Sequence, residues 1–174
     1  MTYHEDSEVR IRDLMPGDAQ IITDEETAQG WHVTVDKYLA RLKDQQEGKC
    51  VSMVAEYHGQ IAGYINVYPA PEAGAFGHMG IPEIVDFGVL EKYRKRGIGT
   101  LLMDAAEKVA GTYASRVCLG VGLHAGYGSA QRMYARRGYI PDGSGVWYGN
   151  RVCEPYSECC NDDDLILYMS RDLP

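Results

Sequence analysis

Residues 83–108 read EIVDFGVLEKYRKRGIGTLLMDAAEK and join a strand pattern, a basic loop and a helix pattern. Apolar residues dominate 81–90, which predicts a strand, and Gly88 inside it suggests a β-bulge. Four cations stand within 92–96 and two glycines follow. Apolar positions then recur at helical spacing over 98–112. The stretch therefore predicts a strand, a glycine-containing loop and a helix in immediate succession.

The start of this predicted helix, at Ile98, is a place where an anion would bind. The first backbone N–H groups of a helix have no partner inside it, and the helix dipole adds positive potential there. Gly97 and Gly99 would let a ligand approach the backbone closely. Arg94 and Arg96 supply charge in a geometry that suits phosphate oxygens. Because cations are unfavourable at a helix N-terminus, we favour a phosphate-bearing ligand over a solvated charge cluster.

Two nucleotide-binding motifs compete with this interpretation. The Walker sequence GxxxxGK[ST] is absent, which favours a carrier whose phosphates take no part in the chemistry. Residues 120–125, GVGLHA, match GxGxx[GA], and Asp142 lies 20 residues beyond Gly122. Only 32 residues follow Asp142, too few for the rest of a doubly wound domain, and the next predicted helix starts several residues too late. A dinucleotide-binding protein is therefore the least favoured alternative.

Composition narrows the class of protein. The chain has 174 residues, 45% of them hydrophobic and 24% charged, which predicts a single globular domain over 1–174. A net charge of -8 argues against nucleic-acid binding. No apolar run is long enough to span a bilayer and the polar N-terminus does not resemble a signal peptide, so we expect no membrane association and a cytoplasmic location. Five cysteines without a CxxC pair favour free thiols and no metal, although Cys153, Cys159 and Cys160 could supply three thiolates.

The rest of the chain predicts a mixture of strands and helices. Helices are expected at 18–30, 36–47 and 129–137, and further strands at 9–12, 50–57, 60–68, 117–121, from 139 onwards and at 165–170. His58-Gly59 is a hairpin signal, whereas 69–80 and most of 143–164 look irregular. Strand pairs mixed with crossover helices predict one α/β domain with a mixed sheet.

Two blocks resemble the GNAT superfamily of N-acetyltransferases. Residues 94–99, RKRGIG, fit its [QR]xxGx[GA] signature, and residues 130–139, AQRMYARRGY, look like its AxxLYxxxGF segment. Residues 83–89 match the family's fourth strand. The resemblance covers about residues 50–140, and 165–170 fits the last strand, but 143–164 cannot be aligned. It implies a mixed, mostly antiparallel central sheet of about six to seven strands with flanking helices, splayed between strands 4 and 5.

The resemblance also implies acetyl-CoA as cosubstrate. In the family the basic loop wraps the pyrophosphate, and the backbone of the fourth strand lies along the pantetheine arm. The residues expected to bind acetyl-CoA are Phe87, Val89, Arg94, Lys95, Arg96, Gly97, Ile98, Gly99, Thr100 and Tyr127. Tyr127 departs from the family pattern, which often has asparagine there, so its contact with the pantetheine is expected to be lost or replaced.

Acetyl transfer to an amine needs a neutral amine, a donor to the thioester oxygen and a proton for the leaving thiolate. By resemblance Tyr134 is the acid, and the Val89 N–H, freed by the bulge, is the oxygen's donor. Glu83 is the candidate base, fourteen residues before the first loop glycine, with Asp86 second. A core tyrosine at 134 and a surface carboxylate at 83 are the plain structural alternatives.

We therefore expect an acetyltransferase that moves an acetyl group from acetyl-CoA to a primary amine of a small molecule or peptide by direct attack. A non-catalytic acyl-CoA-binding or sensor domain, which would keep the same loop, is the alternative. Segment 143–164 combines three aromatic residues with five acidic ones, which favours a cationic acceptor unless it is only a solvated loop. His124 is more readily explained as structural than as a proton shuttle. The oligomeric state stays open, with a homodimer as one option.

Overall fold

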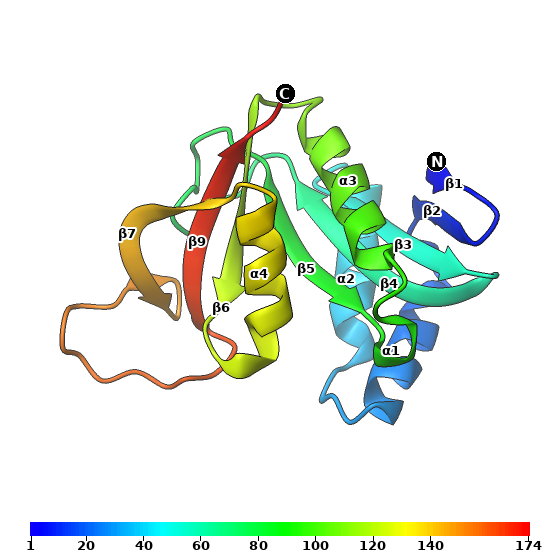
Figure 1. Cartoon of the computed structure of the whole chain (residues 1–174), viewed down its shortest axis with the longest axis horizontal. Helices are drawn as coiled ribbons and strands as arrows, with labels where there is room; N and C mark the ends of the chain where they lie inside the picture. Colours follow the sequence, from blue (N-terminus) through cyan, green and yellow to red (C-terminus); the bar gives the residue numbers. More distant parts are fainter. The chain divides into compact units, whose positions relative to one another are not determined.

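A mixed sequence of strands and helices runs through the computed structural model, which describes all 174 residues (Figure 1). The strands are β1 (Thr2–Glu5), β2 (Val9–Asp13), β3 (Val51–Tyr57), β4 (Gln60–Tyr68), β5 (Glu83–Val89), β6 (Arg116–Gly122), β7 (Ile140–Tyr148), β8 (Arg151–Val152) and β9 (Leu165–Asp172). The helices are α1 (Asp18–Ala28), α2 (Val35–Gln46), α3 (Ile98–Ala110) and α4 (Gly128–Arg136), with short 3-10 turns η1 (Glu91–Tyr93) and η2 (Ala125–Tyr127). No helix combines the length and the apolar character that crossing a bilayer would demand.

Two compact units divide the chain: Met1–Tyr68 with Val85–Val109, and Pro69–Ile84 with Ala110–Pro174. The hydrogen-bonded strand order is β1-β2-β3-β4-β5 in the first unit and β5-β6-β9-β7-β8 in the second. The β5–β6 ladder is parallel and ends at Ile84, whereas the other ladders of known register are antiparallel. The predicted fold class is confirmed, with nine strands instead of about six or seven. The strands missing from the prediction are β1 and β8, which are short.

Helices cover both faces of the sheet in the first unit. Buried side chains of α1 and α2 pack with Val54, Ile61 and Tyr64 of β3 and β4. On the other face, Leu102 of α3 lies against Gly63, where a Cβ atom would stand 3.1 Å from it. Figure 1 shows α3 in front of these strands and α2 behind them. The sheet of this unit is therefore a scaffold that fixes α2, β5 and the start of α3.

The hairpin between β3 and β4 shows why the sequence signal worked. His58 and Gly59 both have left-handed backbone angles, with φ of 48° and 77°, and Tyr57 pairs with Gln60. Two left-handed central residues define the tight turn that matches the twist of the strands. The predicted hairpin is confirmed.

The second unit is built around β9, which pairs with β6 on one side and β7 on the other. Cys118 of β6 and Tyr168 of β9 form a small buried cluster with Phe76, and Trp147 of β7 packs against it. This cluster joins the loop before β5 to the sheet of the unit. It places Glu83, which pairs with Cys118, at the edge of an aromatic core.

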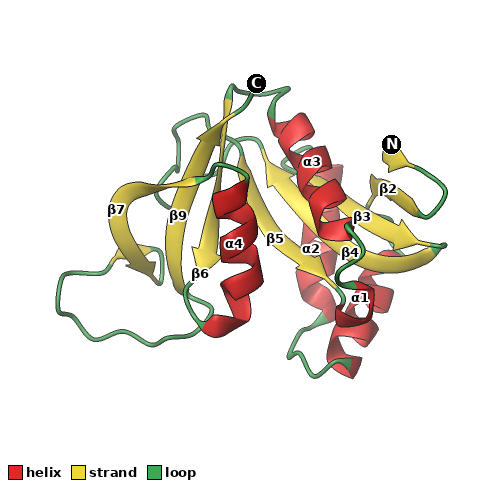
Figure 2. Cartoon of the chain, in the orientation of Figure 1, coloured by secondary structure: helices red, strands yellow, loops and turns green.

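Segment 143–164 is more regular than predicted. Strand β7 continues to Tyr148, and Gly149 and Asn150, with φ of 55° and 66°, turn the chain into β8. The β7–β9 register shifts between Pro141 and Val146, where the glycines disrupt the alternation that marks a strand. That irregularity made the strand look like a turn. Residues 153–164 alone form the long loop seen in Figure 2.

Candidate active site

The basic loop lies between η1 and α3 and is exposed. Lys95 and Gly97 have left-handed backbone angles, with φ of 63° and 79°. A non-glycine residue in this region is uncommon and marks a sharply folded backbone. The carbonyl oxygen of Gly97 accepts the N–H groups of Thr100 and Leu101 at 2.9 and 3.1 Å, so the amides of residues 97–99 precede the first helical hydrogen bond. A Cβ atom on Gly97 would meet nothing within 4 Å, which leaves room for a ligand in front of the helix.

Three of the four cations of the loop remain available to an anion. Lys92 is engaged with Glu25 at 2.6 Å. Arg94 makes only a 3.3 Å contact with Glu91, and both side chains are about half exposed. Lys95 and Arg96 form no ion pair. The positive charge predicted from the sequence is therefore exposed at the start of α3. Lys92 contributes less to it than its neighbours, because it is paired.

Aromatic rings support the two arginines of the loop. The guanidinium carbon of Arg94 lies 5.9 Å from the ring centre of Trp31, and that of Arg96 lies 5.1 Å from the ring centre of Tyr57. Such cation–π stacking restricts the position of a guanidinium. Trp31, which precedes α2, is thus associated with the cationic loop.

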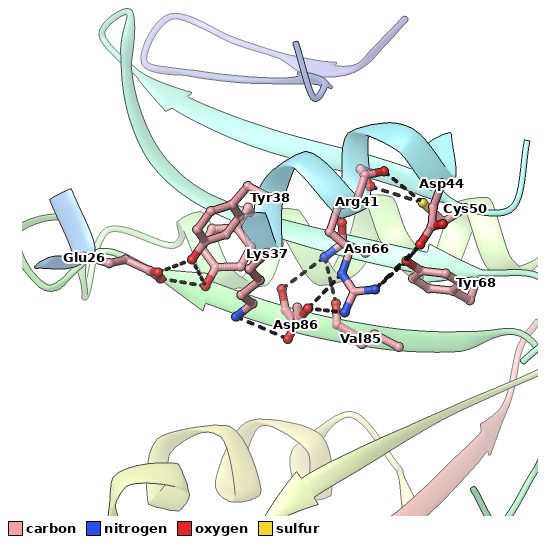
Figure 3. A network of polar contacts seen from close by, with 12 residues as sticks. Glu26, Lys37, Tyr38, Arg41, Asp44, Cys50, Asn66, Tyr68, Val85 and Asp86 are labelled. Carbon is pink, nitrogen blue, oxygen red and sulfur yellow. Dashed lines mark hydrogen bonds and ion pairs between the residues drawn. The ribbon is translucent and has the colours of Figure 1, made fainter. Parts of the chain in front are cut away.

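The backbone of β5 is irregular at Asp86, which has a left-handed φ of 51° (Figure 3). Arg41 of α2 donates to the Asp86 carboxylate at 2.9 Å from Nε and 2.5 Å from Nη2, and Lys37 lies 3.4 Å from it. The side-chain amide of Asn66 on β4 donates to the carbonyl oxygens of Val85 and Asp86 at 3.1 and 3.4 Å. Contacts from α2 and β4 therefore hold the strand in a conformation that its own sequence disfavours.

The left-handed residue of β5 is not the glycine at which the sequence predicts a bulge. The left-handed residue is Asp86, two positions before Gly88, and Asp86 points to α2 instead of solvent. Gly88 is required for a different reason, since a Cβ atom there would stand 2.9 Å from the Tyr64 ring. An aspartate inside a strand pattern carries no signal for a left-handed backbone, whereas a glycine does, and the prediction followed the glycine.

Arg41 continues this polar network beyond Asp86. Its Nη1 atom donates to the hydroxyl of Tyr68 at 2.5 Å, and Tyr68 donates to Asp44 at 2.6 Å. Burial and the bond to Asp44 raise the pKa of Tyr68. The network in Figure 3 therefore spans α2, β4 and β5 through charge-assisted hydrogen bonds, which are the stronger kind.

A second buried group in the first unit centres on Glu26 of α1. The carboxylate is fully buried, and it accepts hydrogen bonds from the hydroxyl groups of Tyr38 and Tyr64, the latter at 2.6 Å. Burial and the nearby carboxylate raise the pKa of Tyr64 well above its ordinary value. Sequence analysis missed this group, although Glu26 stands at helical spacing from the apolar Ala19 and Ile22 and thus on the buried face of α1.

Tyr134 of α4, the predicted acid, is buried with 6% of its surface exposed. Burial raises its pKa well above the ordinary value, so the phenol keeps its proton throughout the neutral range. Its ring lies 5.7 Å from that of Tyr139. The protonated state suits an acid, and the burial also suits a core tyrosine, so the assignment remains a prediction.

Tyr127 and His124 lie in the turn between β6 and α4. Tyr127 covers Gly122, and its hydroxyl donates to Asp163 at 2.9 Å. His124 accepts the Gly126 N–H at Nδ1 and faces Asp163 through Nε2 at 2.9 Å. Both ring nitrogens of His124 are thus hydrogen-bonded, and these contacts hold the turn. Asp163 ties the long loop to this turn.

Glu83, the predicted base, lies at the start of β5 in the second unit. Burial and the charge of Glu83 raise the pKa of Cys118, and the same two causes raise the pKa of Tyr168 to about 12. The carboxylate therefore belongs to the surroundings of these two side chains. The structure places Glu83, Tyr127 and Tyr134 in the second unit, and Phe87, Val89 and residues 94–100 in the first.

The remaining sequence hypotheses concern thiols and nucleotides. All five cysteines are free, and Cys50 and Cys118 are buried. No group of three or more histidine, cysteine, aspartate or glutamate side chains is arranged around a metal site. Helix α4 begins only at Gly128, so the glycines of GVGLHA do not lie at its N-terminus, as a dinucleotide fingerprint requires.

Solved structures with the same fold were found. Ard1 from Thermoplasma volcanium is 21% identical, with a TM-score of 0.69 over 96% of this chain and 99% of that chain. The Salmonella typhimurium acetyltransferase that modifies the N-terminal serine of 50S ribosomal protein L7/L12 is 9% identical, with a TM-score of 0.71 over 100% of both chains. YncA from Salmonella typhimurium, solved with its cofactor acetyl-CoA, is 16% identical, with a TM-score of 0.68 over 97% of this chain and 95% of that chain. At these identities the likeness shows the fold alone.

A search among curated protein sequences found no match. The model of the acetyltransferase (GNAT) family, in contrast, matches residues 19–139. The match covers more than half of the chain and includes the basic loop and the block around Tyr134. The resemblance noted in the sequence is confirmed, and the chain belongs to the GNAT acetyltransferase family.

Proposed function

We propose that the protein transfers an acetyl group from acetyl-CoA to a primary amine of a small molecule or peptide. One observation carries this proposal: three available cations surround an open, glycine-containing backbone at the start of α3. That arrangement suits the phosphates of a CoA thioester. Family membership supports acetyl transfer, and one structure of the same fold was solved with acetyl-CoA.

Residues of the first unit would hold the cosubstrate. The amides of residues 97–99 and the guanidinium groups of Arg94 and Arg96 would bind the pyrophosphate, with Lys95, Ile98 and Thr100 beside them. Phe87 and Val89 would flank the pantetheine arm, and the Val89 N–H would donate to the thioester oxygen. From the second unit, Tyr127 would take the place of the family's usual asparagine.

Two side chains would serve the chemistry. The amine nitrogen bonds to the thioester carbon, and the bond from that carbon to the CoA sulfur breaks. Tyr134 would donate its proton to the leaving thiolate. Glu83 is the base that the sequence predicts, and it would take the proton that the amine loses.

The binding part of the proposal is tested by calorimetric titration with CoA and with pantetheine, which lacks the phosphates. Arg94→Ala combined with Arg96→Ala should weaken CoA binding at least about tenfold and leave pantetheine unchanged. Lys92→Ala is the matched control, because this neighbouring cation already pairs with Glu25. Equal losses for both ligands would contradict phosphate recognition by this loop.

The catalytic part is tested by thiol release from acetyl-CoA against a library of primary amines. An acetyltransferase should release CoA faster with at least one amine than without any. A sensor domain would bind acetyl-CoA with the same loop and release no thiol with any amine. That result would replace the proposed function with the non-catalytic alternative.

A further inference from the structure

Glu26 is a buried carboxylate that none of the roles above uses. It is fully buried, and no lysine or arginine forms an ion pair with it. Its partners are two neutral phenols, from Tyr38 on α2 and Tyr64 on β4. A buried carboxylate without a cationic partner is costly compared with an uncharged side chain of the same shape. Two hydroxyl donors reduce that cost and keep a proton acceptor inside the first unit.

Tyr64 connects this carboxylate to the strand on which the acyl group is proposed to lie. A Cβ atom built on Gly88 would stand 2.9 Å from Cζ and 3.0 Å from the hydroxyl oxygen of Tyr64. The phenol therefore packs on the β5 backbone between Phe87 and Val89. Glu26, Tyr64 and these β5 residues belong to one compact unit.

We propose that Tyr64 and Glu26 form a proton relay that deprotonates the acceptor, a primary ammonium. This inference rests on the proposed function and names a base other than Glu83, the base that the sequence predicts. The ammonium passes a proton to the Tyr64 oxygen, and Tyr64 passes its own hydroxyl proton to Glu26 across their 2.6 Å hydrogen bond. Tyr64 ends neutral, Glu26 becomes a carboxylic acid, and the neutral amine attacks the thioester. After the product leaves, the proton returns by the same path to solvent.

The groups around the relay are consistent with this direction of transfer. Lys37 places its ammonium 5.5 and 5.8 Å from the ring centres of Tyr38 and Tyr64, and Asp86 of β5 balances that charge at 3.4 Å. Tyr38 holds the second oxygen of Glu26. The raised pKa of Tyr64 keeps it a neutral phenol that relays a proton instead of storing a negative charge.

The relay and the predicted base Glu83 make different experimental predictions. An ammonium of pKa about 10.4 needs a base at pH 7 but loses its proton unaided near pH 10. Loss of the true base should therefore cost about 10²-fold in kcat/KM at pH 7, and the cost should shrink towards pH 10. Loss of a merely structural group should lower kcat/KM by a factor that does not depend on pH.

The experiment measures kcat/KM from pH 6 to 10 with the amine that gives the fastest thiol release, for Glu26→Gln, Tyr64→Phe and Glu83→Gln. Tyr68→Phe is the matched control, because Tyr68 lies on the same strand and also donates to a carboxylate, Asp44, at 2.6 Å. Glu26→Gln and Tyr64→Phe should show the pH-dependent loss. Tyr68→Phe should keep the parent's profile, and a pH-dependent loss should not be confined to Glu83→Gln.

Several results would overturn the relay. They are a pH-independent loss in Tyr64→Phe, the same loss in Tyr68→Phe, or a pH-dependent loss confined to Glu83→Gln. Calorimetric binding of acetyl-CoA shows whether each variant is folded. If Glu26→Gln does not bind acetyl-CoA, the pH profile of Tyr64→Phe alone tests the relay. If the parent binds acetyl-CoA but acetylates no amine, the proposed function has failed and the relay falls with it.

Discussion

Carboxylates occur in two contrasting settings in this protein. In the first unit, Glu26 is fully buried and the side chain of Asp86 is only 23% exposed. In the second unit, the acidic residues of 153–164 are mostly exposed, and the side chain of Asp163 is 79% exposed. The buried carboxylates receive their hydrogen bonds from α2 and β4, and those of the loop receive theirs at the surface. The same residue type therefore stabilises a strand in one region and anchors a loop in the other.

The contrast changes how the acidic loop should be interpreted. Asp163 accepts hydrogen bonds from His124 and Tyr127, and Asp162 accepts from Tyr148 and from the Asp164 N–H. These two carboxylates thus hold the loop in place, whether or not they also attract a cationic acceptor. Glu154 and Glu158 form no ion pair, so the prediction of electrostatic attraction is tested most cleanly on them.

The largest effect should come from a buried ionisable group, the phenol of Tyr134. Tyr134→Phe should lower kcat about 10²-fold, equivalent to about 2.7 kcal/mol of activation free energy, because a proton donor acts on the transition state. Acetyl-CoA affinity should stay within about twofold of the parent. Tyr139→Phe, whose ring lies 5.7 Å away, is the control and should keep its turnover. Unchanged kcat in Tyr134→Phe would make Tyr134 a core tyrosine only.

A somewhat smaller effect, on stability, should come from Asp86. Asp86→Ala should lower the free energy of unfolding by about 2 kcal/mol, because Arg41 loses its partner and alanine tolerates a left-handed backbone poorly. Asp86→Asn should cost about 1 kcal/mol, because asparagine adopts that conformation more readily. Urea unfolding measures both. Equal costs for the two variants would contradict a stability contribution from the left-handed backbone at residue 86.

Sequence patterns predicted the parts of the molecule in which the signal is local. The His58-Gly59 hairpin, helix 98–112 and the basic loop were recognisable because turn residues, periodicity and charge lie within a few positions of one another. The contacts around Asp86 and Glu26 were not recognisable in the sequence, because Arg41 lies 45 positions from Asp86 and Tyr64 lies 38 positions from Glu26. Such contacts depend on strand register and helix placement, which local patterns do not specify.

A smaller effect should follow from Asp163→Asn in the exposed region. The variant weakens the hydrogen bonds to His124 and Tyr127, so residues 153–164 should exchange their amide hydrogens faster while the urea midpoint stays nearly unchanged. Hydrogen exchange followed by mass spectrometry measures this. Asp164→Asn is the neighbouring control, because its exposed carboxylate makes no such contact. Faster exchange in both variants would mean that the charge of the loop, not the Asp163 contacts, keeps it in place.

The smallest effect should come from Glu154→Gln combined with Glu158→Gln, which removes two exposed charges that hold no partner. If the loop attracts a cationic acceptor, the KM for that acceptor should rise about twofold to threefold at low ionic strength, and the difference should vanish as salt is added. The urea midpoint should not move, because exposed charges contribute little to folding. Asp24→Asn with Glu72→Gln removes the same two charges elsewhere on the surface and serves as the control. An equal rise in KM for both pairs of substitutions would assign the effect to the net charge of -8 instead of the loop. If KM rises for neither pair, the acidic loop takes no part in choosing the acceptor.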